Sequence, residues 1–209
     1  MIIALDGPAA AGKGTLARRL AAHYGLNYLD TGSLYRAVGM AVLRSGGNPE
    51  DAAQAEAVAR SLSPDQLSSP DLRGEEAGQA ASKVAAIPGV RAALLEFQRS
   101  FADTVPGAVL DGRDIGTVVC PAADAKIFIT ASLEKRAERR FKELLDKGVS
   151  VIWEAVLQDM RERDARDSGR SVAPLVPAAD AVVLDTSELD ADGAFAAAVS
   201  IISQRTCAG

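Results

Sequence analysis

Length, composition and charge place the chain among ordinary globular proteins. Its 209 residues are 48% hydrophobic and carry a formal net charge of −5 at pH 7. This fits one domain with a sizeable core and argues against a general nucleic-acid-binding protein, because such proteins carry a basic face. No apolar run approaches the ~18–20 residues of a membrane span, and no basic stretch precedes the apolar N-terminal residues as in a secretory signal. We therefore expect a cytoplasmic protein with no nucleic-acid or membrane partner.

Histidine and cysteine are too scarce for several kinds of chemistry. The chain has one histidine, His23, and two cysteines, Cys120 and Cys207. A single histidine excludes His-rich zinc sites, and its place just before Tyr24 and Gly25 indicates the end of a helix. Two cysteines do not make a disulfide framework, so we expect two reduced thiols.

The pattern of apolar residues predicts alternating strands and helices. Four short apolar runs are predicted to be buried strands: 2–5, 108–110, 126–129 and 181–184. Helical segments lie between them; the first ends near His23, and the last is an amphipathic helix at the C-terminal end. This order predicts an α/β fold, a parallel β-sheet flanked by helices on both faces. Ligands of such sheets bind beyond the carboxyl ends of the strands, where Asp6 and Asp111 are expected.

Residues 46–74 have the weakest pattern in the chain. Gly, Pro and Ser residues interrupt the segment, and one helix is predicted within it, around 50–61. We interpret the segment as a small peripheral lobe rather than as a linker between domains.

A glycine-rich loop follows the first predicted strand and opens the next helix. Its residues are Gly7, Pro8, Ala9, Ala10, Ala11, Gly12, Lys13, Gly14 and Thr15. In a P-loop of this kind, backbone N–H groups turn toward phosphate oxygens, the helix N-terminus adds partial positive charge, and the lysine reaches the transferred phosphate. We predict that this loop binds ATP and that Lys13 takes part in catalysis.

The residue after this lysine departs from the common P-loop pattern. Gly14 stands where a Ser or Thr hydroxyl ordinarily contacts Mg²⁺, and the hydroxyl comes one place later, at Thr15. We expect the cofactor Mg²⁺ to be held mainly by phosphate oxygens, waters and nearby carboxylates. Asp111 is the candidate carboxylate, acting through water; the alternative is that Asp111 caps the turn before Gly112.

The arginines indicate a second anion site that faces the loop. The chain has 17 arginines and six lysines, and ten basic and nine acidic residues lie between Glu134 and Arg170. Guanidinium groups suit bidentate capture of phosphate oxygens, although a salt-bridged helix face also explains the charges of 134–147. A switch GTPase is excluded, because the only asparagines, Asn27 and Asn48, lie outside any Asn-Lys-x-Asp motif. The pattern favours phosphoryl transfer to a phosphorylated acceptor.

Several motifs together resemble the bacterial cytidylate kinases, nucleoside monophosphate (NMP) kinases with the P-loop NTPase fold. Besides the Gly-Lys-Gly-Thr ending of the loop, these motifs are Asp30-Thr-Gly-Ser-Leu-Tyr-Arg36, Ser82-Lys-Val-Ala-Ala-Ile-Pro-Gly-Val-Arg91, Asp111-Gly-Arg-Asp-Ile-Gly-Thr117 and Arg163-Asp-Ala-Arg-Asp-Ser-Gly-Arg170. The resemblance runs from residue 2 to about 186. It fades in 46–74, which is shorter than the inserted lobe that the family often carries.

The resemblance implies roles for individual residues. Five basic residues would act in catalysis: Lys13, Arg36, Arg113, Arg163 and Arg170. The CMP site would comprise Thr31, Tyr35, Arg36, Ser82, Arg91, Arg113, Asp114, Arg163, Asp167 and Arg170. Within this site Ser82, Arg91 and Asp114 would contact cytosine. Arg136 and Arg140, on the helix after the strand at 126–129, would lie on the ATP side.

The resemblance also implies a reaction and a layout of the chain. The protein would transfer the γ-phosphoryl group of ATP to CMP and dCMP; an AMP or UMP acceptor is the alternative, and a non-catalytic nucleotide-binding regulator is the alternative from another class. A single domain of residues 1–209 would have a core of about 1–30, 104–145 and 171–209. Residues 31–103 would form an NMP-binding lobe, and residues 146–170 a lid. We expect a monomer.

Overall fold

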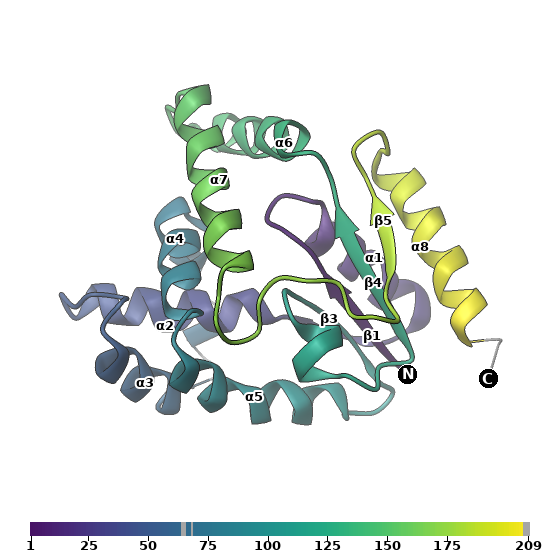
Figure 1. Cartoon of the computed structure of the whole chain (residues 1–209), viewed down its shortest axis with the longest axis horizontal. Helices are drawn as coiled ribbons and strands as arrows, with labels where there is room; N and C mark the ends of the chain where they lie inside the picture. Colours follow the sequence, from purple (N-terminus) through teal and green to yellow (C-terminus); the bar gives the residue numbers. More distant parts are fainter. Residues whose placement is uncertain (64–65, 68, 207–209) are drawn as a thin grey trace.

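A five-stranded parallel sheet forms the centre of the computed structural model, which describes residues 1–63, 66–67 and 69–206 (Figure 1). The strands are β1 (Ile2–Asp6), β2 (Asn27–Asp30), β3 (Ala108–Gly112), β4 (Ala125–Thr130) and β5 (Val182–Asp185). Their order across the sheet is β2-β3-β1-β4-β5. β1 is the central strand, and it is apolar on both faces because both are covered.

Two helices cover one face of the sheet. α1 (Lys13–Tyr24) packs against β1, β2 and β3, and α8 (Ala191–Thr206) lies beside it against β4 and β5. Their shared core includes Ile3, Leu20 and Ile202, all fully buried. α1 ends at Gly25, which adopts the left-handed conformation and donates its N–H to Ala21. Glycine reaches this conformation without steric cost, so the position of Gly25 fixes where the helix ends.

The opposite face is covered by α5 (Pro88–Ala102) and by η3 (Ile115–Val119), a short π-helix. Leu110 of β3 and Ile115 of η3 are fully buried in this second core, with Ala102 at the end of α5. η3 follows β3 after only two residues, Arg113 and Asp114. The chain therefore turns sharply at the carboxyl edge of the sheet.

A helical lobe lies to one side of the sheet and contains most of the segment between β2 and β3 (Figure 1). Its elements are α2 (Thr31–Arg44), α3 (Ala52–Arg60), η2 (Pro70–Arg73), α4 (Glu75–Val84) and α5. α2 and α4 approach one another closely, because a Cβ atom on Gly39 would lie 2.7 Å from the Ala80 Cβ atom. The lobe has its own hydrophobic core, which includes Val38, Val84 and Val90.

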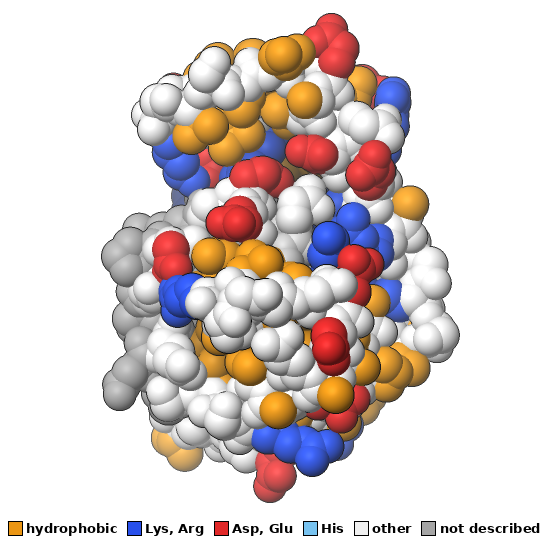
Figure 2. Space-filling view, turned by 90° about the vertical axis from the view of Figure 1, so that its left-hand side faces the viewer, with side chains coloured by type: hydrophobic (Ala, Val, Ile, Leu, Met, Phe, Trp, Pro, Cys, Tyr) orange, Lys and Arg blue, Asp and Glu red, His pale blue; other side chains and the backbone are white. Residues whose placement is uncertain are grey.

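Two further helices form a packed pair above the sheet and the lobe, and they cross at a steep angle (Figure 1). They are α6 (Leu133–Asp146) and α7 (Trp153–Ser168), and α7 also packs against α4. Phe141 and Trp153 meet edge to face near the connection, with ring centroids 5.8 Å apart. Figure 2 views the molecule from the side of the helical lobe; acidic and basic side chains are interspersed on this face, and hydrophobic side chains gather in its upper part.

The sequence predicted most of this architecture. The α/β class, the parallel sheet, four of the strands, the end of α1 near His23 and the helix near 50–61 are confirmed. Strand β2 was missed. Only Leu29 among its four residues is buried, and an edge strand with one buried residue has no clear apolar run. Cys120 is a free, buried thiol, whereas the expectation for Cys207 lies outside the described residues.

Among the residues that the structure describes, no helix has the length and apolar character that crossing a bilayer requires.

The core beneath α1 supplies the first prediction. Leu20→Ala is expected to lower the free energy of unfolding by about 2–5 kcal/mol, because it leaves a cavity at a fully buried position. Leu145→Ala, at a leucine 49% exposed near the end of α6, is the matched control and should change it by less than ~0.5 kcal/mol. Urea unfolding at pH 7 measures both, and equal losses would contradict the placement of α1.

Candidate active site

The P-loop, residues 7–15, joins β1 to α1 at the carboxyl edge of the sheet. Gly7 has φ of 145°, and a Cβ atom there would collide with the carbonyl oxygen of Ile129. Gly12 has φ of 88°, in the left-handed region, directly before α1 begins. The two glycines allow the loop to pass close to β4 and then turn into the helix, with the helix N-terminus directed at the loop.

A cavity of about 410 Å³ opens beside this loop. It is lined by every residue predicted for the CMP site, and these come from four separate parts of the chain: Thr31, Tyr35, Arg36, Ser82, Arg91, Arg113, Asp114, Arg163, Asp167 and Arg170. The cavity is also lined by Gly12, Lys13, Gly14 and Thr15 of the P-loop and by Asp111. The fold thus brings the predicted donor and acceptor groups to one hollow.

Lys13 is buried at the base of this cavity. Its side chain is 5% exposed, and Nζ donates a hydrogen bond to the carbonyl oxygen of Pro8 at 2.7 Å. Burial lowers the pKa of Lys13, the nearby Arg113 lowers it further, and Asp111 opposes both. An anion at this position stabilises the protonated form, because it supplies the opposite charge that the buried ammonium group needs.

Asp111 lies next to the first turn of α1. Its carboxylate is near Gly14, where a Cβ atom would lie 3.4 Å from Oδ2. Burial raises the pKa of Asp111, and Lys13 opposes that rise. Among the described residues, no hydrogen bond or ion pair to this carboxylate is found, although its backbone oxygen accepts from the Thr31 hydroxyl at 2.8 Å. Because Asp111 also lines the cavity, its carboxylate can be reached from there by a hydrated cation or a water.

A buried carboxylate organises the arginines across the cavity. Asp167, near the end of α7, is 2% exposed. It accepts from Arg113 Nε at 3.1 Å, from Arg170 and from the Ser82 hydroxyl at 3.0 Å. Burial alone raises the pKa of Asp167, but Arg113, Arg170 and Arg163 outweigh that effect and hold it below the ordinary value.

Arg163, on the preceding turn of α7, has fewer partners. Its Nε is buried without a hydrogen-bond partner among the described residues. Burial and the nearby Arg113 lower its pKa to about 10. A Cβ atom on Gly78 would lie 3.2 Å from Nη1, so the small residue leaves room for the guanidinium group against α4. A buried guanidinium group with an unsatisfied donor is suited to bind an anion.

Arg91 and Asp114 form a second buried pair on the lobe side of the cavity. The Arg91 side chain is 8% exposed and that of Asp114 is 7% exposed, and Nη2 donates to Oδ2. Nη1 donates to the carbonyl oxygen of Ala85 at 3.2 Å, and the guanidinium carbon lies 5.4 Å from the centroid of the Tyr35 ring. Ser82, on α4, lies on the same side of the cavity.

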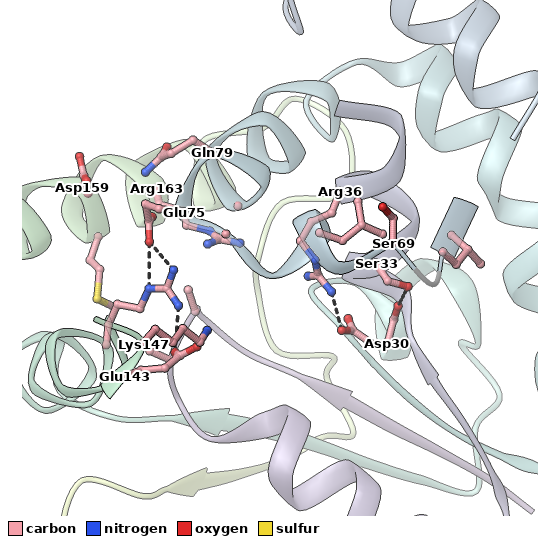
Figure 3. Close-up of a pocket in the computed structure, with 18 of the residues that line it drawn as sticks. Asp30, Ser33, Arg36, Ser69, Glu75, Gln79, Glu143, Lys147, Asp159 and Arg163 are labelled. Carbon is pink, nitrogen blue, oxygen red and sulfur yellow. Dashed lines mark hydrogen bonds and ion pairs between the residues drawn. The ribbon is translucent and has the colours of Figure 1, made fainter. Parts of the chain in front are cut away.

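A larger cavity of about 710 Å³ adjoins the first and lies between the lobe and the α6–α7 pair. Figure 3 shows its two sides. On one side Arg36 pairs with Asp30 at 2.6 Å, and on the other lies Glu75 of α4. Glu75 pairs with Arg140. Arg140 also donates to Glu143 at 2.9 Å.

Arg136 lines neither cavity. It is 5% exposed and donates to the carbonyl oxygens of Ala131 at 3.0 Å and Ala9 at 3.3 Å. Its two terminal nitrogens pair with the Asp164 carboxylate at 3.1 and 2.6 Å. Arg136 therefore joins the P-loop to α7. The sequence predicted only that Arg136 lies on the ATP side, and it did not predict this structural role.

Three acidic partners of the arginines were missed in the sequence: Asp30, Glu75 and Asp164. Asp30 is the first residue of the motif that ends at its partner Arg36, six residues later. Glu75 and Asp164 belong to other helices than Arg140 and Arg136, so only the packing of α4 and α7 against α6 shows these pairs.

A parallel sheet with a P-loop at its carboxyl edge and a facing cluster of arginines defines the class: a P-loop phosphotransferase of the NMP-kinase type. Residues 3–204 match the family model described as cytidylate kinase. The chain is 70% identical to a cytidylate kinase of Paramagnetospirillum magneticum over 98% of both chains, and 61% identical to one of Rhodospirillum rubrum over 99% of both. It therefore belongs to the cytidylate kinase family, as the motifs predicted.

A solved structure supports the fold independently. The chain is similar to an uncharacterized protein from Eubacterium ventriosum, with a TM-score of 0.57 over 97% of this chain and 98% of that one. The two sequences are 13% identical, so this likeness concerns the fold alone.

The contacts of Asp167 supply the second prediction. Asp167→Ala is expected to lower the free energy of unfolding at pH 7 by about 3–5 kcal/mol, because Arg113 and Arg170 lose their shared buried counter-charge. The pKa of Asp167 is depressed in the folded state. Its contribution is therefore complete above the unfolded value of ~3.9 and is lost as the pH falls through the folded pKa.

The loss of stability should thus shrink toward pH 3, which urea unfolding at several pH values would measure. Asp192→Ala, which removes an exposed pair with Arg19, is the control and should cost less than ~1 kcal/mol. A penalty for Asp167→Ala as small as that of the control would contradict the buried cluster.

Proposed function

We propose that this protein transfers the γ-phosphoryl group of ATP to the 5′-phosphate of CMP, and of dCMP, giving ADP and CDP or dCDP. One observation supports this above the others: a single cavity is lined both by the P-loop and by the arginine cluster opposite it. Membership of the cytidylate kinase family supports the choice of acceptor.

The donor side is proposed to be the P-loop. Its backbone N–H groups and the N-terminus of α1 would hold the phosphates of ATP, and Lys13 would neutralise charge on the transferred group. Arg140 would approach ATP from α6. Arg136 would keep the loop in position through the carbonyl oxygen of Ala9, which it already contacts.

The acceptor phosphate is proposed to bind between three arginines. Arg36, Arg113 and Arg170 all line the cavity that the P-loop borders. Each guanidinium group presents a planar fork of donors to phosphate oxygens. Arg163 and Asp167 would bind the ribose hydroxyls, with Thr31 lining the pocket.

The base is proposed to lie against Tyr35, Ser82, Arg91 and Asp114. Asp114 would accept a hydrogen bond from the N4 amine of cytosine, and Arg91 would donate to O2 or N3. Uracil has an oxygen at position 4, so two acceptors would face one another and a buried carboxylate would lose its partner. This difference would favour CMP over UMP.

The chemistry needs no general base. The second pKa of a phosphate monoester is near ~6, so the acceptor oxygens are already largely deprotonated at neutral pH. Catalysis then consists of positioning the two phosphates in line and neutralising their charge. Closure of residues 146–170 as a lid over the lobe, residues 31–103, would keep water out and so prevent hydrolysis of ATP.

A divalent cation fits the carboxyl edge of the sheet. The residues present there suit Mg²⁺: the Asp111 carboxylate is near the P-loop and has no other partner among the described residues. No group of three or more potential protein ligands is found in the described parts of the chain. Mg²⁺ would therefore be held by phosphate oxygens and waters, with Asp111 as the protein group. When bound, it supplies additional positive charge to the phosphates.

An acceptor panel tests the proposal. ADP release is measured with ATP, Mg²⁺ and each of CMP, dCMP, UMP and AMP. We expect the highest kcat/KM with CMP and dCMP, and a loss of at least ~100-fold in turnover for Lys13→Ala, because the charge at the transferred phosphate is lost. A preference for UMP or AMP would contradict the acceptor, and ATP binding without transfer to any of the four would contradict the activity.

Asp114→Asn tests recognition of the base. The amide cannot neutralise Arg91 and presents a donor as well as an acceptor, so the ratio of kcat/KM for CMP to that for UMP should fall by about tenfold or more. Asp103→Asn, at an exposed carboxylate after α5, is the control and should leave the ratio unchanged. An unchanged ratio in Asp114→Asn would remove this residue from base recognition.

A further inference from the structure

Asp6, the last residue of β1, makes contacts that the roles proposed above do not use. Its side chain is 5% exposed and lies directly before the P-loop. Its two carboxylate oxygens accept hydrogen bonds from the backbone N–H groups of Ile115 and Gly116, both at 2.7 Å. These are the first two residues of η3.

Both ends of the loop that contains Arg113 and Asp114 are therefore held by the same residue. At one end the backbone of Asp6 is in register with Gly112 across the parallel pair of β1 and β3. At the other end its carboxylate holds the start of η3. The only residues between these two points are Arg113 and Asp114, so the position of their side chains is restricted from both sides.

The space around the carboxylate is also closely fitted. A Cβ atom on Gly116 would lie 3.3 Å from Asp6 Oδ2 and 3.1 Å from Cδ of Lys126. Glycine at 116 thus lets the backbone approach the carboxylate closely enough to donate to it. A carboxylate at the start of a helix also stabilises the helix, because it accepts hydrogen bonds from N–H groups that have no partner within the helix.

We infer that Asp6 is a positioning residue for the acceptor site: through Ile115 and Gly116 it fixes Arg113 against the acceptor phosphate and Asp114 against the base. That the acceptor is CMP comes from the proposed function, on which this inference rests. Asp6 contacts neither nucleotide in this scheme, and it acts by setting the distance between the end of β1 and the loop after β3.

If Asp6 is a positioning residue, its substitution should weaken binding of the acceptor nucleotide more than binding of ATP. In Asp6→Asn, the amide nitrogen faces one of the two N–H donors and cannot accept from it. The start of η3 should loosen, while the P-loop stays in place because β1 is still paired with β3 and β4 on both sides. We expect the KM for CMP to rise on the order of tenfold or more, since small misplacements of binding groups have large effects, and the CMP-to-UMP ratio of kcat/KM to fall. The Kd of ATP, measured without an acceptor, should change less than threefold.

A matched control lies at the other end of the same strand. Asp124 Oδ2 accepts from the backbone N–H of Ile2 at 2.6 Å, which is the same kind of contact far from the cavity. Asp124→Asn should leave the KM for CMP and the CMP-to-UMP ratio unchanged. Amide hydrogen exchange gives a readout that does not depend on activity: Ile115 and Gly116 should exchange faster in Asp6→Asn and not in Asp124→Asn.

A second variant keeps the test decisive if Asp6→Asn does not fold. Gly116→Ala crowds the same carboxylate without changing its charge, and it should give the same rise in the KM for CMP with little change in the Kd of ATP. Equal effects on ATP and CMP, or no effect on CMP in either variant, would overturn the inference. If the unmodified protein transfers phosphate to no monophosphate, the proposed function fails instead, and faster exchange at Ile115 and Gly116 still decides whether Asp6 holds η3.

Discussion

The burial of several positive charges around one carboxylate is the strongest constraint on this structure. A charged side chain that leaves water is destabilising unless a partner of opposite sign replaces the solvent. Asp167 pairs with Arg113 and Arg170, but Arg163 and Lys13 border the same cavity without a full counter-charge among the described residues. Positive charge therefore exceeds negative charge there, and under the proposed function a bound phosphate would offset the excess. Lys13 and Arg163, whose burial without a full counter-charge lowers the stability of the fold, are therefore also the side chains suited to bind an anion.

The position of these charges follows from the sheet. β1 and β3 are neighbouring parallel strands, so the P-loop after β1 and the turn after β3 come out at the same edge. Arg113 and Asp114 lie in that turn and face different partners, Asp167 on α7 and Arg91 on α5. Two consecutive residues thus link the cavity to the helical lobe and to the α6–α7 pair. A small shift of this turn therefore changes the Arg113–Asp167 pair and the Asp114–Arg91 pair at the same time.

Helix α6 connects the remaining parts. Arg136 contacts the P-loop backbone and Asp164 of α7, whereas Arg140 pairs with Glu75 of α4. The contacts with Ala9 and Glu75 join residues that lie 127 and 65 positions apart in the sequence, and the contact with Asp164 spans 28. Movement of α6 and α7 relative to the lobe requires the Arg140–Glu75 pair to separate. Since the pair is only partly buried, its separation costs less than that of the buried pairs near Asp167.

The α/β class, the P-loop and the cytidylate kinase family could all be predicted from the amino-acid sequence. The reason is that glycine spacing, apolar runs and short motifs are local properties of the chain. The residues predicted for the CMP site all line the cavity, because they lie within the motifs, whereas Arg18, Asp30 and Glu143 line it without having been predicted. The long-range pairs of Arg91, Arg136 and Arg140, the edge position of β2 and the contact of Asp6 with η3, 109 residues away, emerge only from the three-dimensional structure. Such pairs depend on the distances between packed elements, and nothing in the local sequence of either partner encodes that distance.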